Sequence, residues 1–268
     1  MARHINYTPQ HRGTTRTAPP RRDRLWLVVC LALLAAALAF LLLFAGGYHT
    51  YRKTGALYTA LAGQYAAPAA QTTLPTGVAA SRMDFAGLQA QNADTVAWLD
   101  LPGLDQSLPV THTTDNAFYL HHAFDGTSAT SGCLFLAAQD SADGSDLYNV
   151  IYGHNLHNGT MFGRLPDYAD AAYCAQYPTF TLYTPAGDYT CRIFSCHAAE
   201  DGDEIYSAGW TAGADYDAFL GRLKDLSAYD TGVTPAAGSK VVTLSTCSTS
   251  YASNTHRYVV HAVMEGMG

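Results

Sequence analysis

The longest apolar run in the chain covers residues 25–44 and contains no charged residue. Twenty apolar residues in one helix match the thickness of the hydrocarbon core of a bilayer. Six arginines and one aspartate precede the run, whereas only Arg52 and Lys53 follow it closely. The positive-inside rule then predicts a cytoplasmic basic tail over residues 1–24, a single transmembrane helix, and an extracellular remainder, as in a single-pass protein of the cell membrane.

A cleaved signal peptide is the alternative interpretation of this run. The apolar region of a signal peptide is shorter, about 7–15 residues, and ends in a small-x-small cleavage site. Phe44-Ala-Gly-Gly47 is a poor match to such a site. The pattern therefore favours a retained membrane anchor.

Residues 45–81 are expected to connect the membrane segment to a folded domain. Residues 48–66 are rich in alanine and tyrosine and are predicted to form a juxtamembrane helix. Residues 67–77 are rich in proline, threonine and glycine, which is typical of a linker.

The pattern from residue 82 to residue 268 is that of one extracellular domain built mainly from strands. Ser81 is predicted to cap a short helix over residues 82–92, with Asp84 at the capping-box position. Short runs rich in β-branched and aromatic residues then alternate with turn signals, which indicates a closed or nearly closed β structure. The predicted strands lie near residues 95–101, 107–113, 132–138, 147–153, 178–184, 188–198, 240–246 and 257–264.

One segment of this domain has the periodicity of a helix instead of a strand. An insertion over roughly residues 199–239 separates the last two predicted strands from the others. Its apolar residues recur at the spacing of one helical face. They are Tyr216, Phe219, Leu220, Leu223 and Leu226. A helix is therefore expected before the last two strands.

Charge is distributed unevenly along the chain, whose formal net charge is −7. Residues 1–24 carry a net charge of +5, whereas residues 25–268 carry −12. An acidic outer domain argues against nucleic acid as a partner. The arginine-rich tail is better interpreted as a topology signal.

The cysteines are too sparse to indicate a disulfide framework. Cys30 lies in the apolar run, and the other five cysteines are an odd number with no CxxC pair. Cys133, Cys191 and Cys196 lie on apolar strands and are expected to be buried. A cysteine left over outside the core suits a reactive thiol.

Cys247 is the strongest candidate for such a thiol. It ends the strand that begins at Val241, and Arg257 opens the next strand. If these two strands are neighbours, Cys247 and Arg257 lie side by side. A thiolate is the nucleophile in cysteine chemistry, and a nearby cation favours both the thiolate and an oxyanion. A buried core cysteine with an unrelated surface arginine remains the alternative.

His154 is the third candidate, at the end of the strand that leads to Gly153. We expect the glycine to allow a tight turn from which the histidine projects. Histidine is the side chain best suited to exchange protons near neutral pH. By itself, His154 is equally explained as an ordinary loop histidine. Together with Cys247 and Arg257, it predicts a nucleophile, an acid/base and a cation.

These residues stand in blocks that resemble the signature blocks of sortases, the cysteine transpeptidases of Gram-positive cell envelopes. The blocks are Tyr152-Gly-His154-Asn, Thr243-Leu-Ser-Thr-Cys247 and Arg257. Class B resembles the chain best over roughly residues 82–264. The segments that carry this resemblance are Asp84-Phe-Ala-Gly-Leu-Gln, Asp115-Asn116 with Tyr119-Leu120, and Gly132-Cys-Leu-Phe-Leu136.

The resemblance implies a closed β-barrel of about eight strands, with an N-terminal helical segment and a helix inserted before the last two strands. It also implies an enzyme of the EC 3.4.22 type that needs no metal and no cofactor. Cys247 would attack a carbonyl in the C-terminal sorting signal of a secreted protein. Arg257 would stabilise the oxyanion or hold the substrate backbone, and His154 would protonate the departing amine. An amine of a peptidoglycan precursor or of a pilin would then accept the acyl group.

Four further residues match positions that line the substrate groove of class B sortases. They are Asn116, Leu120, Tyr152 and Ser245. Plain packing or turn capping explains them equally well. The chain departs from some relatives directly after the cysteine, where Ser248-Thr-Ser250 stands in place of an acid.

Three other functions compete with this interpretation. His154-x-x-His157 and the pair His121-His122 are weak candidates for metal ligands, because no third ligand stands at a typical spacing. Papain-like and related peptidases place the cysteine before the histidine, which is the reverse of the order here. A membrane-tethered peptidase or a non-enzymatic adhesion module would also be extracellular, and the adhesion module would need neither Cys247 nor Arg257.

Overall fold

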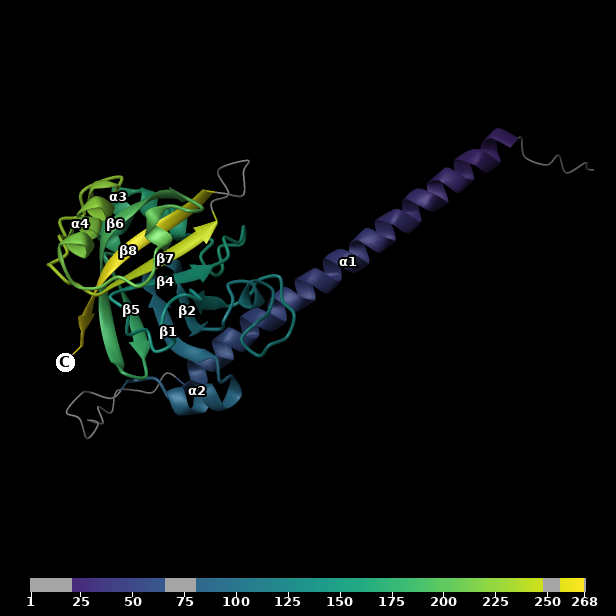
Figure 1. Ribbon diagram of the computed structural model, residues 1–268. Coiled ribbons are helices and arrows are strands. Elements are labelled where there is room, and N and C mark those ends of the chain that lie inside the picture. Colours follow the sequence, from purple (N-terminus) through teal and green to yellow (C-terminus); the bar gives the residue numbers. More distant parts are fainter. Residues whose placement is uncertain (1–20, 66–80, 248–255, 268) are drawn as a thin grey trace, which may run out of the picture. The chain divides into compact units, whose positions relative to one another are not determined.

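The computed structural model of the chain describes residues 21–65, 81–247 and 256–267 (Figure 1). The chain divides into two compact units, residues 1–49 and residues 50–268. Helix α1 (Arg21–Tyr65) runs through the boundary between them. The predicted membrane segment and the predicted juxtamembrane helix are therefore parts of one continuous helix.

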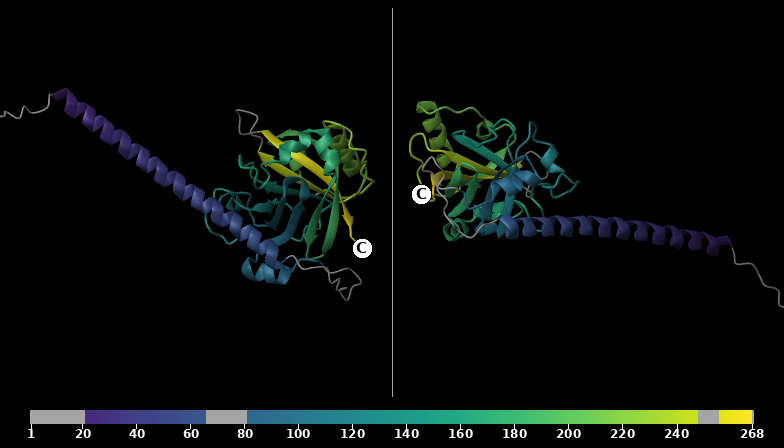
Figure 2. Two further views of the ribbon diagram at one scale, coloured as in Figure 1. Left: turned by 180° about the vertical axis from the view of Figure 1, so that it is seen from behind. Right: turned by 90° about the horizontal axis from the view of Figure 1, so that it is seen from below.

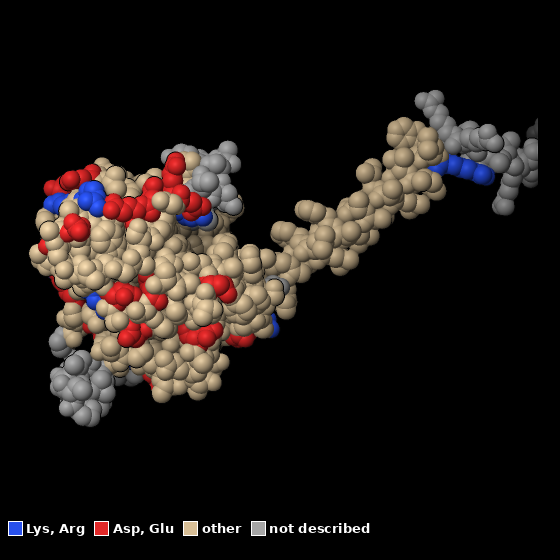
Figure 3. Space-filling view, viewed as in Figure 1, with Lys and Arg blue, Asp and Glu red and all other residues tan. Residues whose placement is uncertain are grey.

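The large apolar side chains of residues 25–44 are exposed. Leu43, for example, is 77% exposed, and its large apolar neighbours between Leu25 and Phe44 are exposed as well. Figure 3 shows this stretch without charged side chains. The helix is long and apolar enough to cross a membrane over Arg24–Tyr65. An exposed apolar surface of this extent is unfavourable in water and suits a lipid environment.

Eight strands close into a barrel in the second unit (Figures 1 and 2). The order around the barrel is β1-β2-β3-β4-β7-β8-β6-β5, and β5 pairs with β1 to close it. The predicted fold class, an eight-stranded closed barrel with a helical N-terminal segment and a helix before the last two strands, is confirmed. The strands are β1 (Thr95–Leu101), β2 (Gln106–Thr111), β3 (Leu134–Leu136), β4 (Tyr148–Gly153), β5 (Thr179–Thr184), β6 (Gly187–Glu200), β7 (Val241–Cys247) and β8 (His256–Gly266).

Two of the strand pairs are parallel and the others are antiparallel. The parallel pairs are β2 with β3 and β4 with β7. A parallel pair needs a long crossover connection, and β5, β6 and the inserted helix all lie in the connection between β4 and β7.

Helix α4 (Ala214–Asp225) covers the outer side of the barrel and is the helix expected in the insertion. Tyr216, Phe219, Leu220 and Leu223 are buried against strand residues that include Tyr148, Phe194, Val241 and Val259. The strands under α4 are therefore buried on both faces, which explains their continuous apolar runs. Leu226 was wrongly placed on this face, because α4 ends at Asp225 and Leu226 is 56% exposed.

The short helix α2 (Phe85–Gln91) begins later than predicted. Its N-cap is Asp84, whose carboxylate accepts a hydrogen bond from the backbone N–H of Gly87 at 3.0 Å. Ser81 does not cap the helix, because its hydroxyl donates to the carboxylate of Asp188 on β6 at 2.5 Å. The carboxylate three positions further along reaches the first turn and caps it instead.

Several elements of one or two turns were not predicted. Helix α3 (Ala171–Gln176) is capped by Asp170, which accepts from the N–H of Ala172 at 2.9 Å. Elements this short carry too few residues to show a period. The others are the 3₁₀ helices η1 (Pro102–Leu104), η2 (Phe118–Leu120), η3 (Leu165–Ala169) and η4 (Glu204–Tyr206).

A chain of buried hydrogen bonds connects β6, β8 and β7. His197 Nδ1 donates to the carbonyl of Ala198 at 2.9 Å, because a carbonyl oxygen can only accept. His197 Nε2 then accepts from His261 Nε2 at 3.0 Å, and His261 Nδ1 accepts from the Thr243 hydroxyl at 2.8 Å. With both imidazoles neutral, this is the order of donors and acceptors that satisfies all three contacts.

The histidine chain makes stability depend on pH. Burial lowers the pKa of His197, and burial together with the neighbouring His197 lowers the pKa of His261 well below its ordinary value. In the unfolded chain the two histidines bind protons below about pH 6.5, whereas in the folded protein they stay neutral to a lower pH. Their contribution to the free energy of unfolding is therefore complete above that pH and is lost as the pH falls.

The wild type should therefore exceed His261→Gln in free energy of unfolding by less at pH 5.5 than at pH 7.5. Urea titrations of both proteins in detergent measure this difference in free energy of unfolding. A difference that is the same at both pH values would contradict the prediction.

Candidate active site

The ends of β4, β7 and β8 bring the predicted catalytic residues to one edge of the barrel. The parallel pairing of β4 with β7 sets Gly153 opposite Thr246, so His154 follows directly beside the end of β7. The antiparallel pairing of β7 with β8 sets Cys247 opposite Arg257, as expected from the pattern. The side chain of Cys247 lies outside the described residues, as do residues 248–255.

A groove of about 380 Å³ opens at this edge. Every predicted site residue whose side chain the structure describes lines it. They are His154 and Arg257 together with Asn116, Leu120, Tyr152 and Ser245. Segments far apart in the sequence therefore contribute to one cavity. The other lining residues are Phe135, Gly153, Asp201, Gly202, Tyr206 and Thr246.

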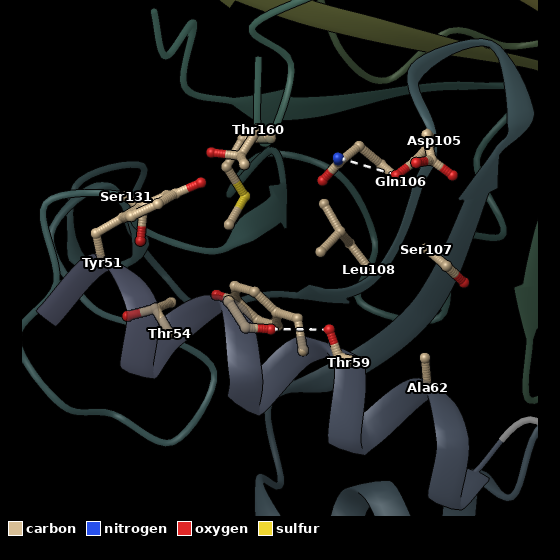
Figure 4. Close-up of a pocket in the computed structure, with 13 residues that line it drawn as sticks. Tyr51, Thr54, Thr59, Ala62, Asp105, Gln106, Ser107, Leu108, Ser131 and Thr160 are labelled. Atoms are coloured by element: carbon tan, nitrogen blue, oxygen red, sulfur yellow. Dashed lines mark hydrogen bonds between the residues drawn. The ribbon is translucent and has the colours of Figure 1, made fainter. Parts of the chain in front are cut away.

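A second cavity, of about 320 Å³, lies between the last turns of α1 and loops of the barrel. Figure 4 shows hydroxyl side chains around it, among them Thr54, Thr59, Ser131 and Thr160. The described residues that line it include no histidine, cysteine, lysine or arginine. These described residues offer no thiol, and no histidine that could activate one of their hydroxyl groups, so the groove at the end of β7 is the candidate active site.

One hydrogen bond fixes the orientation of the His154 ring. His154 Nε2 lies 2.7 Å from the carbonyl oxygen of Leu120, which ends η2. Because the carbonyl accepts, Nε2 carries the hydrogen. In the neutral ring, Nδ1 then carries the lone pair and is the nitrogen that can accept a hydrogen bond.

The glycine before His154 acts through its small size. The backbone of Gly153 stays in β4 and has no positive φ, so the tight turn expected there is wrong. A Cβ at this position would come within 2.6 Å of side-chain carbons of Leu134 and Phe162. Gly153 therefore allows the end of β4 to pack closely beneath the groove.

The loop behind His154 is fixed from the end of α1. Gly132 adopts φ +61°, and a Cβ there would lie 2.4 Å from the carbonyl of Tyr119 and 3.2 Å from the His154 ring. The Tyr58 hydroxyl of α1 donates to the carbonyl of Gly132 at 2.8 Å. Only glycine fits this left-handed position so close to the imidazole.

Two aromatic rings form one wall of the groove. The rings of Tyr152 and Tyr206 stack with centroids 6.0 Å apart, and the Tyr206 hydroxyl lies 3.0 Å from the hydroxyl of Ser245. Burial raises the pKa of Tyr206 to about 12 and also raises the pKa of Tyr152. Both phenols therefore stay neutral at physiological pH and present apolar rings to the groove.

The amide of Asn116 is engaged with the neighbouring chain. Its Oδ1 accepts from the N–H of Ala138 at 2.8 Å, and its Nδ2 donates to Gln139 at 3.3 Å. Asn116 thus has the turn-stabilising role that was its alternative explanation, and it still lines the groove.

The Arg257 side chain is held at the rim of the groove and is only 19% exposed. Its NH2 group donates to Asp201 at 2.9 Å, and its NH1 group donates to the carbonyl of His256 at 3.3 Å. The side chains of Asp201, Tyr206 and Phe135 were not predicted as site residues. Phe135 stands in a block that carries the family resemblance, whereas the sequence around Asp201 and Tyr206 gives no signal for the groove.

The metal alternative finds no support in the geometry. Among residues 21–65, 81–247 and 256–267, no three His, Cys, Asp or Glu side chains converge as metal ligands would. One ring nitrogen of His154 is bonded to a backbone carbonyl.

Comparison with known proteins gives a consistent result. The family model described as the sortase domain matches residues 99–265. Sortase B of Listeria monocytogenes is 29% identical over 168 residues, which are 63% of this chain and 68% of that protein. Sortase B of Staphylococcus aureus is 27% identical over 181 residues, which are 68% of this chain and 74% of that protein.

A solved structure agrees with these relatives in fold. It is the crystal structure of a Bacillus anthracis protein described as similar to sortase B, with a TM-score of 0.70 and 25% identity. The match covers 82% of this chain and 98% of that chain. The family match spans the barrel from β1 to β8, including every element that builds the groove, and the chain therefore belongs to the sortase family, in class B.

Proposed function

We propose that this protein is a membrane-anchored cysteine transpeptidase that cleaves the C-terminal sorting signal of secreted proteins and transfers the acyl group to an amine of the cell wall or of a pilin. Membership of the sortase family supplies the reaction class. The observation that carries the proposal is the meeting of His154, Arg257 and the backbone of Cys247 at one edge of the barrel.

Cys247 is the proposed nucleophile. Its thiolate attacks a backbone carbonyl of the sorting signal, a C–S bond forms, and the carbonyl oxygen becomes an oxyanion. Arg257 stands opposite Cys247 in the strand register and supplies hydrogen-bond donors to that oxyanion. One such donor is worth about 3–4 kcal/mol in the transition state.

His154 is the proposed acid and base. Protonated at Nδ1, it gives its proton to the departing amine as the C–N bond breaks, which leaves a thioester on Cys247. The incoming amine then attacks the thioester, and Nδ1 takes up the proton that this amine loses. The new amide bond forms as the thiolate leaves. The hydrogen bond from Nε2 to Leu120 keeps Nδ1 as the reacting nitrogen in both steps.

The aromatic wall and its neighbours are the proposed binding surface for the sorting signal. Tyr152 provides an apolar ring, and Ser245 provides a hydroxyl beside it. Leu120 and Asn116 line the same groove from η2 and the segment before it. These residues set the shape of the cavity, while the nucleophile and the cation carry the chemistry.

The apolar segment of α1 is the proposed anchor in the cell membrane. Its exposed side chains and its length support this role. The arginine-rich flank of residues 1–24 favours a cytoplasmic N-terminus and an extracellular catalytic domain. The acidic surface of that domain, visible in Figure 3, speaks against nucleic acid as a partner.

The first test is selective reaction of the nucleophile. Iodoacetamide should label Cys247 in the folded protein, because a catalytic thiol must be accessible and a nearby cation favours its thiolate. The other cysteines of the barrel are buried, and burial raises the pKa of Cys133 to about 12. Peptide mapping by mass spectrometry should find Cys133, Cys174, Cys191 and Cys196 unlabelled until denaturant is added.

The second test is transfer between a sorting peptide and an amine. Cys247→Ala should abolish both cleavage and the trapped thioester. Arg257→Lys keeps the charge but loses the planar paired donors, so turnover should fall about 10²–10³-fold, more than substrate binding weakens. A peptide chosen by cleavage from a randomised library serves as donor, with triglycine or a lysine amide as acceptor.

The outcomes of this test separate the alternatives. Cleavage without transfer to either amine would indicate a tethered peptidase. A folded Arg257→Lys protein with wild-type turnover would remove the arginine from the mechanism. No reaction by the wild type with any peptide of the library would favour an adhesion module.

The third test concerns the membrane anchor. Trypsin added to intact protoplasts should digest residues 50–268 and spare the arginine-rich tail, because the tail is expected to stay inside. Antibodies against each end of the chain measure this on a blot. A full-length chain that resists trypsin until the membrane is dissolved would contradict the proposed orientation.

A further inference from the structure

An acidic side chain from outside the predicted site contacts the proposed oxyanion donor. The carboxylate of Asp201 accepts a hydrogen bond from Arg257 NH2 at 2.9 Å, and both residues line the groove. Asp201 is 49% exposed, whereas Arg257 is 19% exposed, so the carboxylate lies on the outer side of the guanidinium.

The strand register brings the end of β6 beside Arg257. Ala199 of β6 pairs with Arg257 of β8, so these two side chains share a face of the sheet. Asp201 follows two residues later, in the turn after β6, and its carboxylate reaches the guanidinium from there. Glu200, which pairs with His256, points to the other face and lies 3.5 Å from the His256 ring.

A tight turn holds Asp201 in this position. The N–H of Asp203 donates to the carbonyl of Glu200 at 3.2 Å, and the N–H of Glu200 donates to the Asp203 carboxylate at 2.7 Å. Gly202 adopts φ +91°, which an L side chain rarely adopts. Asp201 thus stands at the tip of a turn that is closed by two hydrogen bonds.

We propose that Asp201 is a positioning residue that holds the Arg257 guanidinium ready for the oxyanion, an inference that rests on the proposed function. An arginine side chain has many rotamers, and ordering it during the reaction costs free energy. Asp201 on NH2 and the carbonyl of His256 on NH1 fix the plane of the guanidinium before substrate arrives. Donors that are fixed in advance stabilise a transition state without reorganisation.

The part of the insertion that precedes α4 therefore contributes a side chain to the proposed active site. The three residues after Cys247 are serine and threonine, so the strand that carries the nucleophile brings no acid there. Asp201 provides a carboxylate from the β6 side of the same groove.

The alternative is an exposed ion pair that only stabilises the fold. Asp201→Asn separates the two roles, because it keeps the size of the side chain and removes its charge. If Asp201 positions Arg257, kcat for transfer to triglycine should fall about tenfold, with a smaller change in KM. Asp201→Glu should recover part of that loss, since it restores the carboxylate. Thermal unfolding of each full-length protein in detergent confirms that the variants are folded.

Glu200→Gln is the matched control. It removes an acid from the neighbouring position of the same strand, on the face away from the groove. Its kcat should equal that of the wild type. A tenfold loss in Glu200→Gln as well would show that any charge lost from this turn has the same effect, and would overturn the assignment of Asp201.

The decisive measurement is a double-mutant cycle with Arg257→Lys. Asp201 acts through the guanidinium, so Asp201→Asn should cost less than about twofold once the guanidinium is absent. An equal loss in both backgrounds would overturn the proposal, and so would wild-type kcat in Asp201→Asn alone. If the wild type transfers no peptide, the proposed function itself fails. This outcome is distinguished from failure of the Asp201 proposal because the wild type is assayed before any variant.

Discussion

The parallel pairing of β4 with β7 decides where the groove lies and which side chains reach it. It brings the ends of two strands that are far apart in the sequence to the same edge, with Gly153 opposite Thr246. The antiparallel return of β8 then adds Arg257 opposite Cys247. A shift of one residue in either register would turn the side chains to the other face of the sheet. The groove therefore exists because the backbone hydrogen bonds of three central strands fix one register.

Packing on both faces makes that register hard to change. The interior of the barrel holds Val242, Leu244 and Val260, and α4 covers Val241 and Val259 on the outer face. A slip of one residue in β7 would turn Thr243, which stands between Val242 and Leu244, into the interior of the barrel. The segments that complete the groove are loops and single turns: η2 bonds the His154 ring, and the turn after β6 bonds Arg257. The strands set the positions of the proposed catalytic residues, and contacts from the loops orient the His154 and Arg257 side chains.

The sequence predicted the eight strands well, because their β-branched runs and turn residues are local signals. The residues that the motif blocks single out, such as His154 and Ser245, line one groove, while their roles stay predictions. Local signals failed where a distant contact decides the outcome. Ser81 bonds Asp188 of β6 and leaves the helix cap to Asp84. Asp201 and Tyr206 belong to the groove only because β6 lies beside β8 and η4 lies against Tyr152. No spacing along the chain contains that information.

The burial of Tyr58, Leu61 and Tyr65 in the barrel core has a consequence for the range of the enzyme. Helix α1 packs against the domain from these residues on. The segment that connects the proposed anchor to the barrel is therefore no longer than the chain from Phe44 to Tyr58. Fully extended, this connecting segment spans at most about 50 Å, and as a helix it spans about 20 Å. If residues 25–44 span the membrane as proposed, a substrate would have to present its cleavage site within that distance of the bilayer. An anchor of this kind would favour substrates that are themselves still held at the membrane surface.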